Sequence, residues 1–180
     1  MCGHKFAAGG CTDYEIVNYA SEAAAFADGA VVTHYGPCAA CSTRQDLAVY
    51  MYYFDMTTVG KQCGEWASTI FSKGVRCFEN LGMTSSCAYI WASNAKFDGS
   101  YCRSICLKDY YEPYNGAPPT CPLNDCLQCD EDNAGPLFKK FSGRTRRNSG
   151  LESSITRPCD TVESLTHYQC GTPTFDEFLQ

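Results

Sequence analysis

A histidine lies at the end of a short β-branched segment, close in sequence to side chains that could assist it in proton transfer. His34 follows the run AVVT and precedes Tyr35 and a glycine. Imidazole titrates near neutral pH, which suits histidine to general acid or base catalysis. Asp46, in the segment that follows, could orient the imidazole. We therefore predict a catalytic group of His34, Tyr35, Asp46 and Tyr50, with a core histidine bonded to a backbone carbonyl as the alternative.

A second polar group is the basic, glycine-flanked run GRTRRNSG at residues 143–150. Guanidinium groups bind carboxylate, sulfate or phosphate through paired hydrogen bonds, and glycines let a backbone approach a ligand closely. The run therefore predicts an anchor for an acidic small molecule or glycan. The alternative is internal pairing with the acidic run DEDN that precedes it. The predicted substrate-binding residues are Gln45, Arg144, Arg146, Arg147 and Asn148.

Cysteines offer a third kind of chemistry, most densely in the stretch CPLNDCLQCDED at residues 121–132. Its x4 and x2 spacing, with Cys159 as a fourth cysteine after 29 intervening residues, is that of plant-type ferredoxins, where four thiolates bind a [2Fe–2S] cluster. The pairs Cys38/Cys41 and Cys126/Cys129 would also supply four thiolates for zinc. The residues PLND are larger than those of the ferredoxin loop, and the many cysteines of this chain produce such spacings by chance. We predict disulfides that pin the C-terminal part to the helical body, with no metal or other cofactor; only a weak calcium site, not of the EF-hand type, stays open at the acidic run.

The run AVVTHYGPCAACSTRQDLAVY reads as a strand, a CxxC pair and a helix. Over these residues the chain resembles the active-site segment of thioredoxin-like proteins. The resemblance implies that Cys38 is the nucleophile and Cys41 the resolving thiol, because a helix N-terminus lowers a thiol pKa. The alternative, which we prefer, is that each of these cysteines forms a structural disulfide with a distant partner.

The elements that must position these groups are mainly helices. Apolar residues recur at helical spacing, and Thr12, Ser42 and several glycines mark helix ends. Ser42 and Gln45 suggest a capping box, and Leu47, Tyr50, Met51 and Phe54 suggest the buried face of the helix that follows. The expected elements are a strand at 30–34 and helices at 12–26, 42–54, 58–71, 76–81, 84–97 and 98–110, with one or two helical turns at 135–141.

The chain changes character after residue 111, where the run EPYNGAPPTCP predicts a loop. We therefore expect one small, mainly α, disulfide-rich domain over residues 1–180. Its helical body covers about residues 12–111, and an irregular C-terminal wrap covers about residues 112–180. The last ten residues are expected to form an open tail or a strap.

Composition limits the compartment and the partners. Fourteen of the 180 residues are cysteines, which indicates an oxidising setting, extracellular or in a secretory or organellar lumen. The net charge of −6 does not favour a nucleic-acid partner. No run approaches the length of apolar sequence that spans a membrane.

Three functions stay open at this stage. We favour a secreted or lumenal enzyme that acts by acid/base chemistry on a small, acidic or aromatic molecule, as a lyase, isomerase or hydrolase. This requires residues 34–50 and 130–150 to converge on a pocket. The alternatives are an extracellular binding or assembly protein with a protein partner, and a thiol-disulfide oxidoreductase that uses Cys38 and Cys41.

Overall fold

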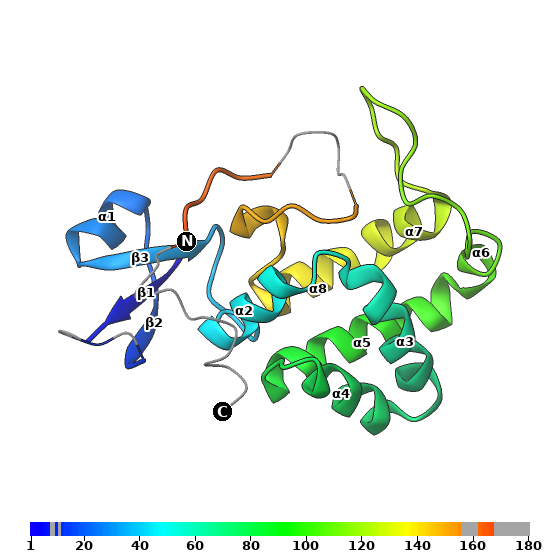
Figure 1. Cartoon of the computed structure of the whole chain (residues 1–180), viewed down its shortest axis with the longest axis horizontal. Helices are drawn as coiled ribbons and strands as arrows, with labels where there is room; N and C mark the ends of the chain where they lie inside the picture. The colour runs from blue at the N-terminus through cyan, green and yellow to red at the C-terminus, as the bar shows by residue number, and fades with distance from the viewer. Residues whose placement is uncertain (8–9, 11, 156–161, 168–180) are drawn as a thin grey trace.

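The computed structural model of the chain describes residues 1–7, 10, 12–155 and 162–167. These residues form a mainly α structure, as predicted, and also one small sheet that was not predicted. Figure 1 shows the sheet at one end, the larger helical part at the other and α2 between them. The elements are β1 (Cys2–Phe6), β2 (Tyr14–Asn18), α1 (Glu22–Ala27), β3 (Ala30–His34), α2 (Arg44–Tyr52), α3 (Met56–Thr69), α4 (Phe71–Asn80), α5 (Ser85–Tyr101), α6 (Arg103–Cys106), α7 (Asp125–Asn133), α8 (Gly135–Ser142) and the 3-10 turn η1 (Arg147–Ser149).

The N-terminal part is an antiparallel sheet with the strand order β2-β1-β3. The predicted strand at 30–34 is confirmed, whereas the predicted helix at 12–26 is wrong. Tyr14 to Asn18 forms an edge strand, and a helix begins only at Glu22, where the Ser21 hydroxyl accepts the N–H of Ala24. Pairing with β1, which local sequence patterns did not reveal, overrides the helical spacing of this segment.

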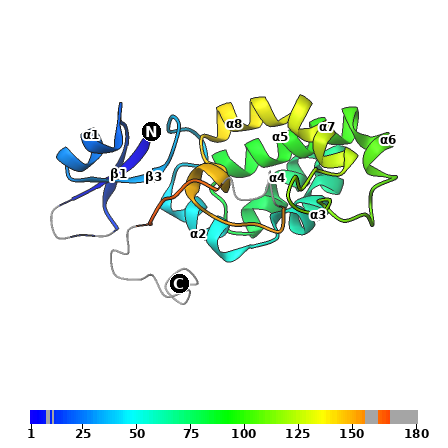
Figure 2. The same ribbon diagram turned by 90° about the horizontal axis from the view of Figure 1, so that it is seen from above.

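The core of the helical part lies between α2, α3, α4 and α5, which Figure 2 shows from above. Gly74 was expected to end a helix, but α4 continues through it. A Cβ atom at Gly74 would lie 2.5 Å from the Cα and Cβ atoms of Ala67. This glycine is therefore needed for the close crossing of α3 and α4. Gly82, at a φ of 100°, follows the end of α4 as predicted.

The start of α2 differs from its prediction by one residue. Thr43, rather than Ser42, is the N-cap, and its side chain accepts the N–H of Asp46. The predicted partner Gln45 instead donates to the carbonyl of Gly82 at 2.7 Å. Because Ser42 does not cap the helix, its buried hydroxyl points inward, toward His34.

The buried face of α2 is narrower than predicted. Tyr50 is buried, as expected, but Met51 and Phe54 are each 56% exposed. The helix is short and lies at the edge of the core, so it has one buried stripe only. At its C-terminal end Tyr52 is also mostly exposed, whereas Tyr53 packs against the core.

Disulfides join segments that are distant in the chain. The predicted helix at 98–110 is divided between the end of α5 and the short α6, yet its two cysteines do lie on one face. Cys102 bonds to Cys129 and Cys106 bonds to Cys126, so two bridges attach α7 to this face. The predicted anchoring of the C-terminal part is confirmed.

The CxxC pair at Cys38 and Cys41 is structural. Cys38 bonds to Cys2, and Cys41 bonds to Cys87 in the core. A further bridge links α3 to α4, and no described cysteine carries a free thiol. The preferred prediction, that each of these two cysteines forms a structural disulfide with a distant partner, is confirmed, and the redox, iron–sulfur and zinc alternatives do not apply to the described cysteines. Cys159 and the expected C-terminal tail lie outside the described residues.

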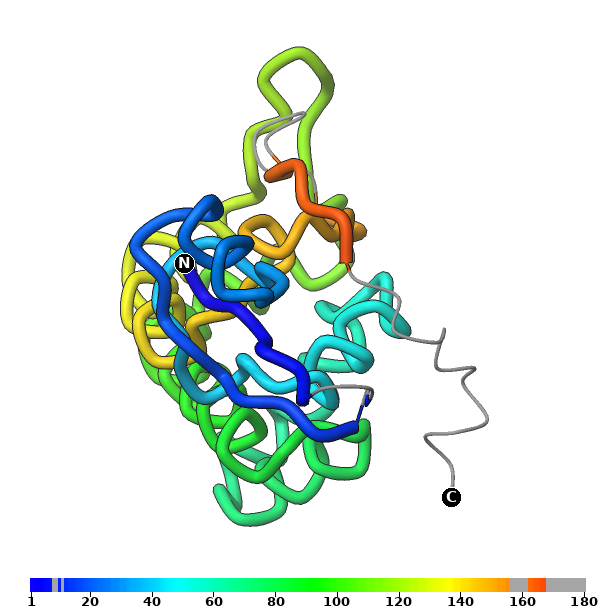
Figure 3. Tube along the Cα trace, turned by 90° about the vertical axis from the view of Figure 1, so that its left-hand side faces the viewer, coloured from blue at the N-terminus to red at the C-terminus, as the bar shows by residue number. Residues whose placement is uncertain are grey.

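The C-terminal wrap begins with a loop that extends away from the helical body, and α7 and α8 then pack against that body. Figure 3 shows the loop before α7 projecting beyond the helices, which agrees with the loop predicted for residues 112–122. The turns expected at 135–141 are present as α8. Among the described residues, no helix is both long enough and apolar enough to cross a bilayer.

Candidate functional site

The two segments that were expected to converge are in contact. The N–H of Tyr35 donates to the carbonyl of Asn148 at 2.8 Å, and the N–H of Cys41 donates to the carbonyl of Ser142 at 2.8 Å. We call this contact between residues 33–53 and 142–152 the arginine joint, because two arginine side chains fill it. Convergence is confirmed, but what lies between the segments is protein.

Arg144 is the centre of the arginine joint and has no exposed surface. Its Nε donates to the carbonyl of Cys41, and its Nη1 donates to the carbonyl of Thr33, both at 2.9 Å. Further bonds reach the Thr33 hydroxyl, the Ser42 carbonyl and the Ser149 hydroxyl. Burial lowers the Arg144 pKa to about 10, so the group stays charged at neutral pH. Neutral oxygens of β3 and of the α2 entry stabilise this charge.

Arg146 and Asn148 are also used internally. Arg146 donates to the carbonyls of Tyr50 and Tyr53 at the end of α2, and to the carbonyl of Glu152. Asn148 donates to the carbonyls of Tyr35 and Gly143, at 2.7 and 2.8 Å. Arg147 is partly exposed. These hydrogen bonds of Arg144 and Arg146 thus go to backbone and hydroxyl oxygens, rather than to the acidic run that was the alternative.

His34 is a core histidine. Its Nδ1–H donates to the carbonyl of Tyr35 at 3.1 Å, and its Nε2 accepts the hydroxyl of Ser42 at 2.9 Å. Burial, followed by the charge of Arg144, lowers the His34 pKa to about 3. The imidazole is therefore neutral at physiological pH. This is the arrangement that was the alternative to a catalytic role.

Ser42 and His34 have the separation of a nucleophile and its base, a pair that sequence reasoning missed. The Ser42 hydroxyl also accepts the N–H of Ala39 at 2.8 Å. Neither Ser42 nor His34 has exposed surface, and Arg144 lies against both. The pair is therefore closed to a substrate in this structure.

The other predicted catalytic residues do not join His34 in a cavity. Asp46 is buried and accepts the N–H and hydroxyl of Thr84, with which it fixes the start of α5. The Tyr50 hydroxyl accepts the indole N–H of Trp91 at 2.9 Å, and burial raises the Tyr50 pKa above its ordinary value. Catalysis by this group stays a prediction, and its side chains serve the core.

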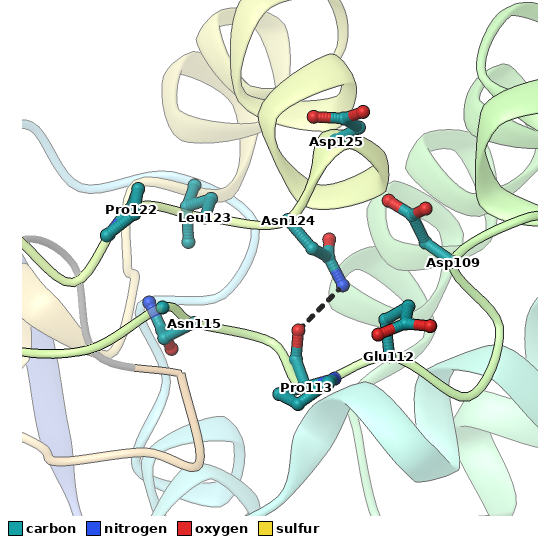
Figure 4. A pocket seen from close by; sticks show the side chains of 9 residues that line it. Asp109, Glu112, Pro113, Asn115, Pro122, Leu123, Asn124 and Asp125 are labelled. Carbon is teal, nitrogen blue, oxygen red and sulfur yellow. Dashed lines mark hydrogen bonds between the residues drawn. The ribbon is translucent and has the colours of Figure 1, made fainter.

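A pocket of about 380 Å³ lies elsewhere, between the projecting loop and the start of α7. We call it the acidic pocket. Figure 4 shows Asp109 and Glu112 on one side, Asp125 above them, and Pro122 and Leu123 on the opposite side. The volume falls within the range of about 300–1,000 Å³ that is common for ligand sites. The lining residues are Asp109, Glu112, Pro113, Asn115, Gly116, Pro122, Leu123, Asn124 and Asp125.

Two residues of the acidic pocket hold its walls in place. Asn124 caps α7 by accepting the N–H of Leu127 at 2.9 Å, and it donates to the carbonyl of Pro113 at 3.2 Å, the dashed line of Figure 4. Asp109 accepts the N–H of Cys126 at 3.0 Å. Glu112 and Asp125 are exposed, and neither has an ion-pair partner among the described residues. They leave the pocket with negative charge available to a ligand.

Aromatic side chains stand next to the acidic pocket. Tyr111 is 93% exposed, and Tyr110 and Tyr114 flank the Lys61 ammonium group, which lies 5.1 and 5.3 Å from their ring centroids. Sequence reasoning assigned this segment to a loop and gave it no site. The signal that could have found it is the alternation of acidic, tyrosine and proline residues around Asp109 to Asp125.

No group of three or more histidine, cysteine, aspartate or glutamate side chains is arranged to hold a metal ion in the part of the chain that the structure describes. The acidic run that left a calcium site open belongs to the last turn of α7, so its carboxylates follow a helix rather than a binding loop.

The fold and these two regions define a small, disulfide-stapled, mainly α-helical protein with an acidic surface pocket. The chain belongs to a family of unknown function, DUF8771, whose model matches residues 71–165. The match covers just over half of the chain, from α4 through the acidic pocket and the arginines of the joint. No curated protein and no solved structure matches the chain.

Proposed function

We propose that this protein is a secreted or lumenal binding protein whose acidic pocket takes a lysine or arginine side chain of a protein partner. The observation that carries the proposal is the pocket of about 380 Å³, which carries carboxylates from Asp109, Glu112 and Asp125 and has no basic lining residue. The predicted catalytic histidine, in contrast, is closed to solvent.

The chemistry of the pocket favours a cation. Three carboxylates line one open hollow, and their summed charge attracts a cation to it. Pro113, Pro122 and Leu123 offer apolar contact to an aliphatic stem, as lysine and arginine side chains prefer. Tyrosines attract cations through their ring faces, and Lys61 already occupies such a position beside the pocket.

The compartment forms part of the proposal. Five disulfides among the described residues fit an oxidising setting, since cytosolic thiol systems keep cysteines reduced. An extracellular or lumenal location would bring the pocket into contact with exported proteins. Two of these bridges also hold α7, which forms one wall of the pocket.

A titration with oligolysine and oligoarginine peptides, followed by amide NMR shifts, tests the proposal. The double variant Glu112→Gln/Asp125→Asn removes two exposed pocket carboxylates and is expected to weaken binding about tenfold. The matched control Glu15→Gln/Glu22→Gln makes the same charge change on exposed residues of the sheet region and should bind as the wild type does. Equal weakening in both variants would show attraction to net charge alone and would overturn the proposal.

Acid/base catalysis on a small molecule is a second proposal, favoured by the 2.9 Å separation of Ser42 Oγ and His34 Nε2. It requires an opening to solvent beside Arg144. A fluorophosphonate probe tests it on the native protein, with Ser42→Ala as the control. Labelling that disappears in the variant supports an enzyme, whereas labelling seen only after denaturation excludes one.

A further inference from the structure

Two carboxyl groups meet where α5 contacts α7. The side-chain amide of Asn94 donates both to Asp98 Oδ2, at 3.1 Å, and to Asp130 Oδ1, at 3.0 Å. Asn94 and Asp98 belong to α5, and Asp130 belongs to the last turn of α7. This cluster has no role in the arginine joint or in the acidic pocket.

The cluster has fewer hydrogen-bond donors than its acceptor atoms require. Asn94 Oδ1 and Asp98 Oδ1 are closed to solvent, and neither has a hydrogen-bond partner among the described residues. The amide nitrogen of Asn94 already serves two carboxyl oxygens, and every other polar side-chain atom of the cluster is an acceptor if both aspartates are ionised. A proton on one carboxyl group supplies the missing donor.

No positive charge relieves the pair. Burial comes first among the causes that raise the pKa of Asp98, to about 8, and the charge and hydrogen bond of Asp130 come next. The basic groups on the surrounding helices are either engaged elsewhere or exposed, and Arg76 of α4 is one of the exposed ones. Lys139 of α8 pairs with Glu131, Lys61 of α3 lies over Tyr110 and Tyr114, Lys73 of α4 over Trp66, Lys96 of α5 over Phe71 and Lys140 of α8 over Phe141, while Arg103 of α6 is exposed.

The covalent framework keeps the two carboxyl groups together. Cys102, one turn after Asp98, is bonded to Cys129, the residue before Asp130. A second bridge joins the same helices near the start of α7. The pair therefore cannot relieve its repulsion by moving apart, and proton uptake is the remaining way to lower its energy.

We propose that Asp98 and Asp130 share one proton and form a pH-sensitive contact between α7 and α5, which is most stable when the proton is bound. Because this proton is held more tightly in the folded protein than in the unfolded chain, stability falls as pH rises. Stability is lost between about pH 4, near the ordinary pKa of an aspartate, and about pH 8, near the pKa of Asp98 in the folded protein. Within this range the folding equilibrium constant falls up to about tenfold per pH unit.

Carboxyl carbon NMR of the wild-type protein tests the shared proton directly. We expect the Asp98 Cγ signal to titrate near neutral or weakly alkaline pH, with a response at the Asp130 Cγ signal. Titration of both signals below about pH 5 would overturn the proposal. A shift of both signals on addition of calcium at constant pH would also overturn it, because the pair would then hold a cation.

Urea unfolding of variants tests the consequence. Asp98→Asn supplies a permanent amide donor. Between about pH 5 and about pH 8, the unfolding equilibrium constant of the wild type should therefore rise about a hundredfold more than that of the variant. Asp132→Asn, an exposed residue of the same helix, should keep the wild-type dependence. Identical pH dependence in wild type and Asp98→Asn would contradict the proposal, and the NMR titration decides the matter if that variant does not fold.

Discussion

The arginine joint and the acidic pocket differ in whether their charged side chains are buried or exposed. In the joint, an acidic protein buries Arg144 and half-buries Arg146, with backbone carbonyls as their partners. In the pocket, Glu112 and Asp125 stay exposed. Arginine has several donors and no acceptor, so the free carbonyls at strand and helix ends satisfy it. A carboxylate needs donors, which free backbone N–H groups supply mainly at helix starts.

Asp109 illustrates the rule, because it uses such a donor. It accepts the N–H of Cys126 in the first turn of α7, whereas Glu112 finds no equivalent group. The comparison teaches that an abundance of one charge type does not show which charges face solvent. The number of free backbone donors and acceptors nearby decides that.

The largest expected effect comes from Arg144→Ala. The change removes the cation and leaves carbonyls of Thr33 and Cys41 buried without partners, so we expect a loss of about 3–5 kcal/mol in the free energy of unfolding. Urea unfolding with intact disulfides measures it. Arg103→Ala, at an exposed position of α6, should stay within about 0.5 kcal/mol. A small loss for Arg144→Ala would mean that the joint does not organise the fold.

A smaller effect is expected when a staple of the pocket is removed. Cys106→Ser/Cys126→Ser opens a bridge across 20 residues and should cost about 2–4 kcal/mol. Hydrogen exchange should rise at the pocket lining. Removal of the Cys63–Cys77 bridge, across 14 residues, is the control and should leave exchange at the pocket unchanged. Equal exchange in both variants would show that the bridge does not shape the pocket.

The histidines of the sheet region should make stability depend on pH in the opposite sense to the carboxyl pair. Burial lowers the pKa of His4 to about 4 and of His34 to about 3, from 6.5. The unfolded chain therefore binds these protons more readily, and stability is lost as pH falls below about 6.5. Each histidine contributes at most about 1.4 kcal/mol per pH unit. In urea unfolding, His34→Gln should lose less stability than the wild type as pH falls. The same pH dependence in both proteins would contradict the lowered His34 pKa.

The smallest expected effect on stability belongs to the acidic pocket itself. Glu112→Gln/Asp125→Asn should change the free energy of unfolding by less than about 0.5 kcal/mol, because both side chains are exposed. Thermal unfolding in the absence of peptide measures this. A larger change in either direction would contradict the inference that these two carboxylates are solvated and do not hold the fold together.

Much of the helical part was predictable because its signals are local. The start of α5 at Thr84, the end of α4 at Gly82 and the paired faces of Cys102 and Cys106 follow from capping, left-handed glycine and turn spacing. The segment at 12–26 was not predictable in this way, because its strand depends on pairing with β1. The pocket was missed because its walls come from a loop and a helix start that meet through a β-bridge, hydrogen bonds and disulfides, which no local sequence pattern reveals.

By itself, the sequence determined a mainly helical, disulfide-rich chain. It indicated an oxidising setting and suggested, without proving it, a contact between its two polar segments. It did not determine what that contact contains. The tertiary structure decided that Arg144 and His34 are internal, because backbone oxygens of β3 and α2 meet them there. It also decided that carboxylates, rather than arginines, line the open pocket, since exposure depends on which donors and acceptors the folded backbone leaves free.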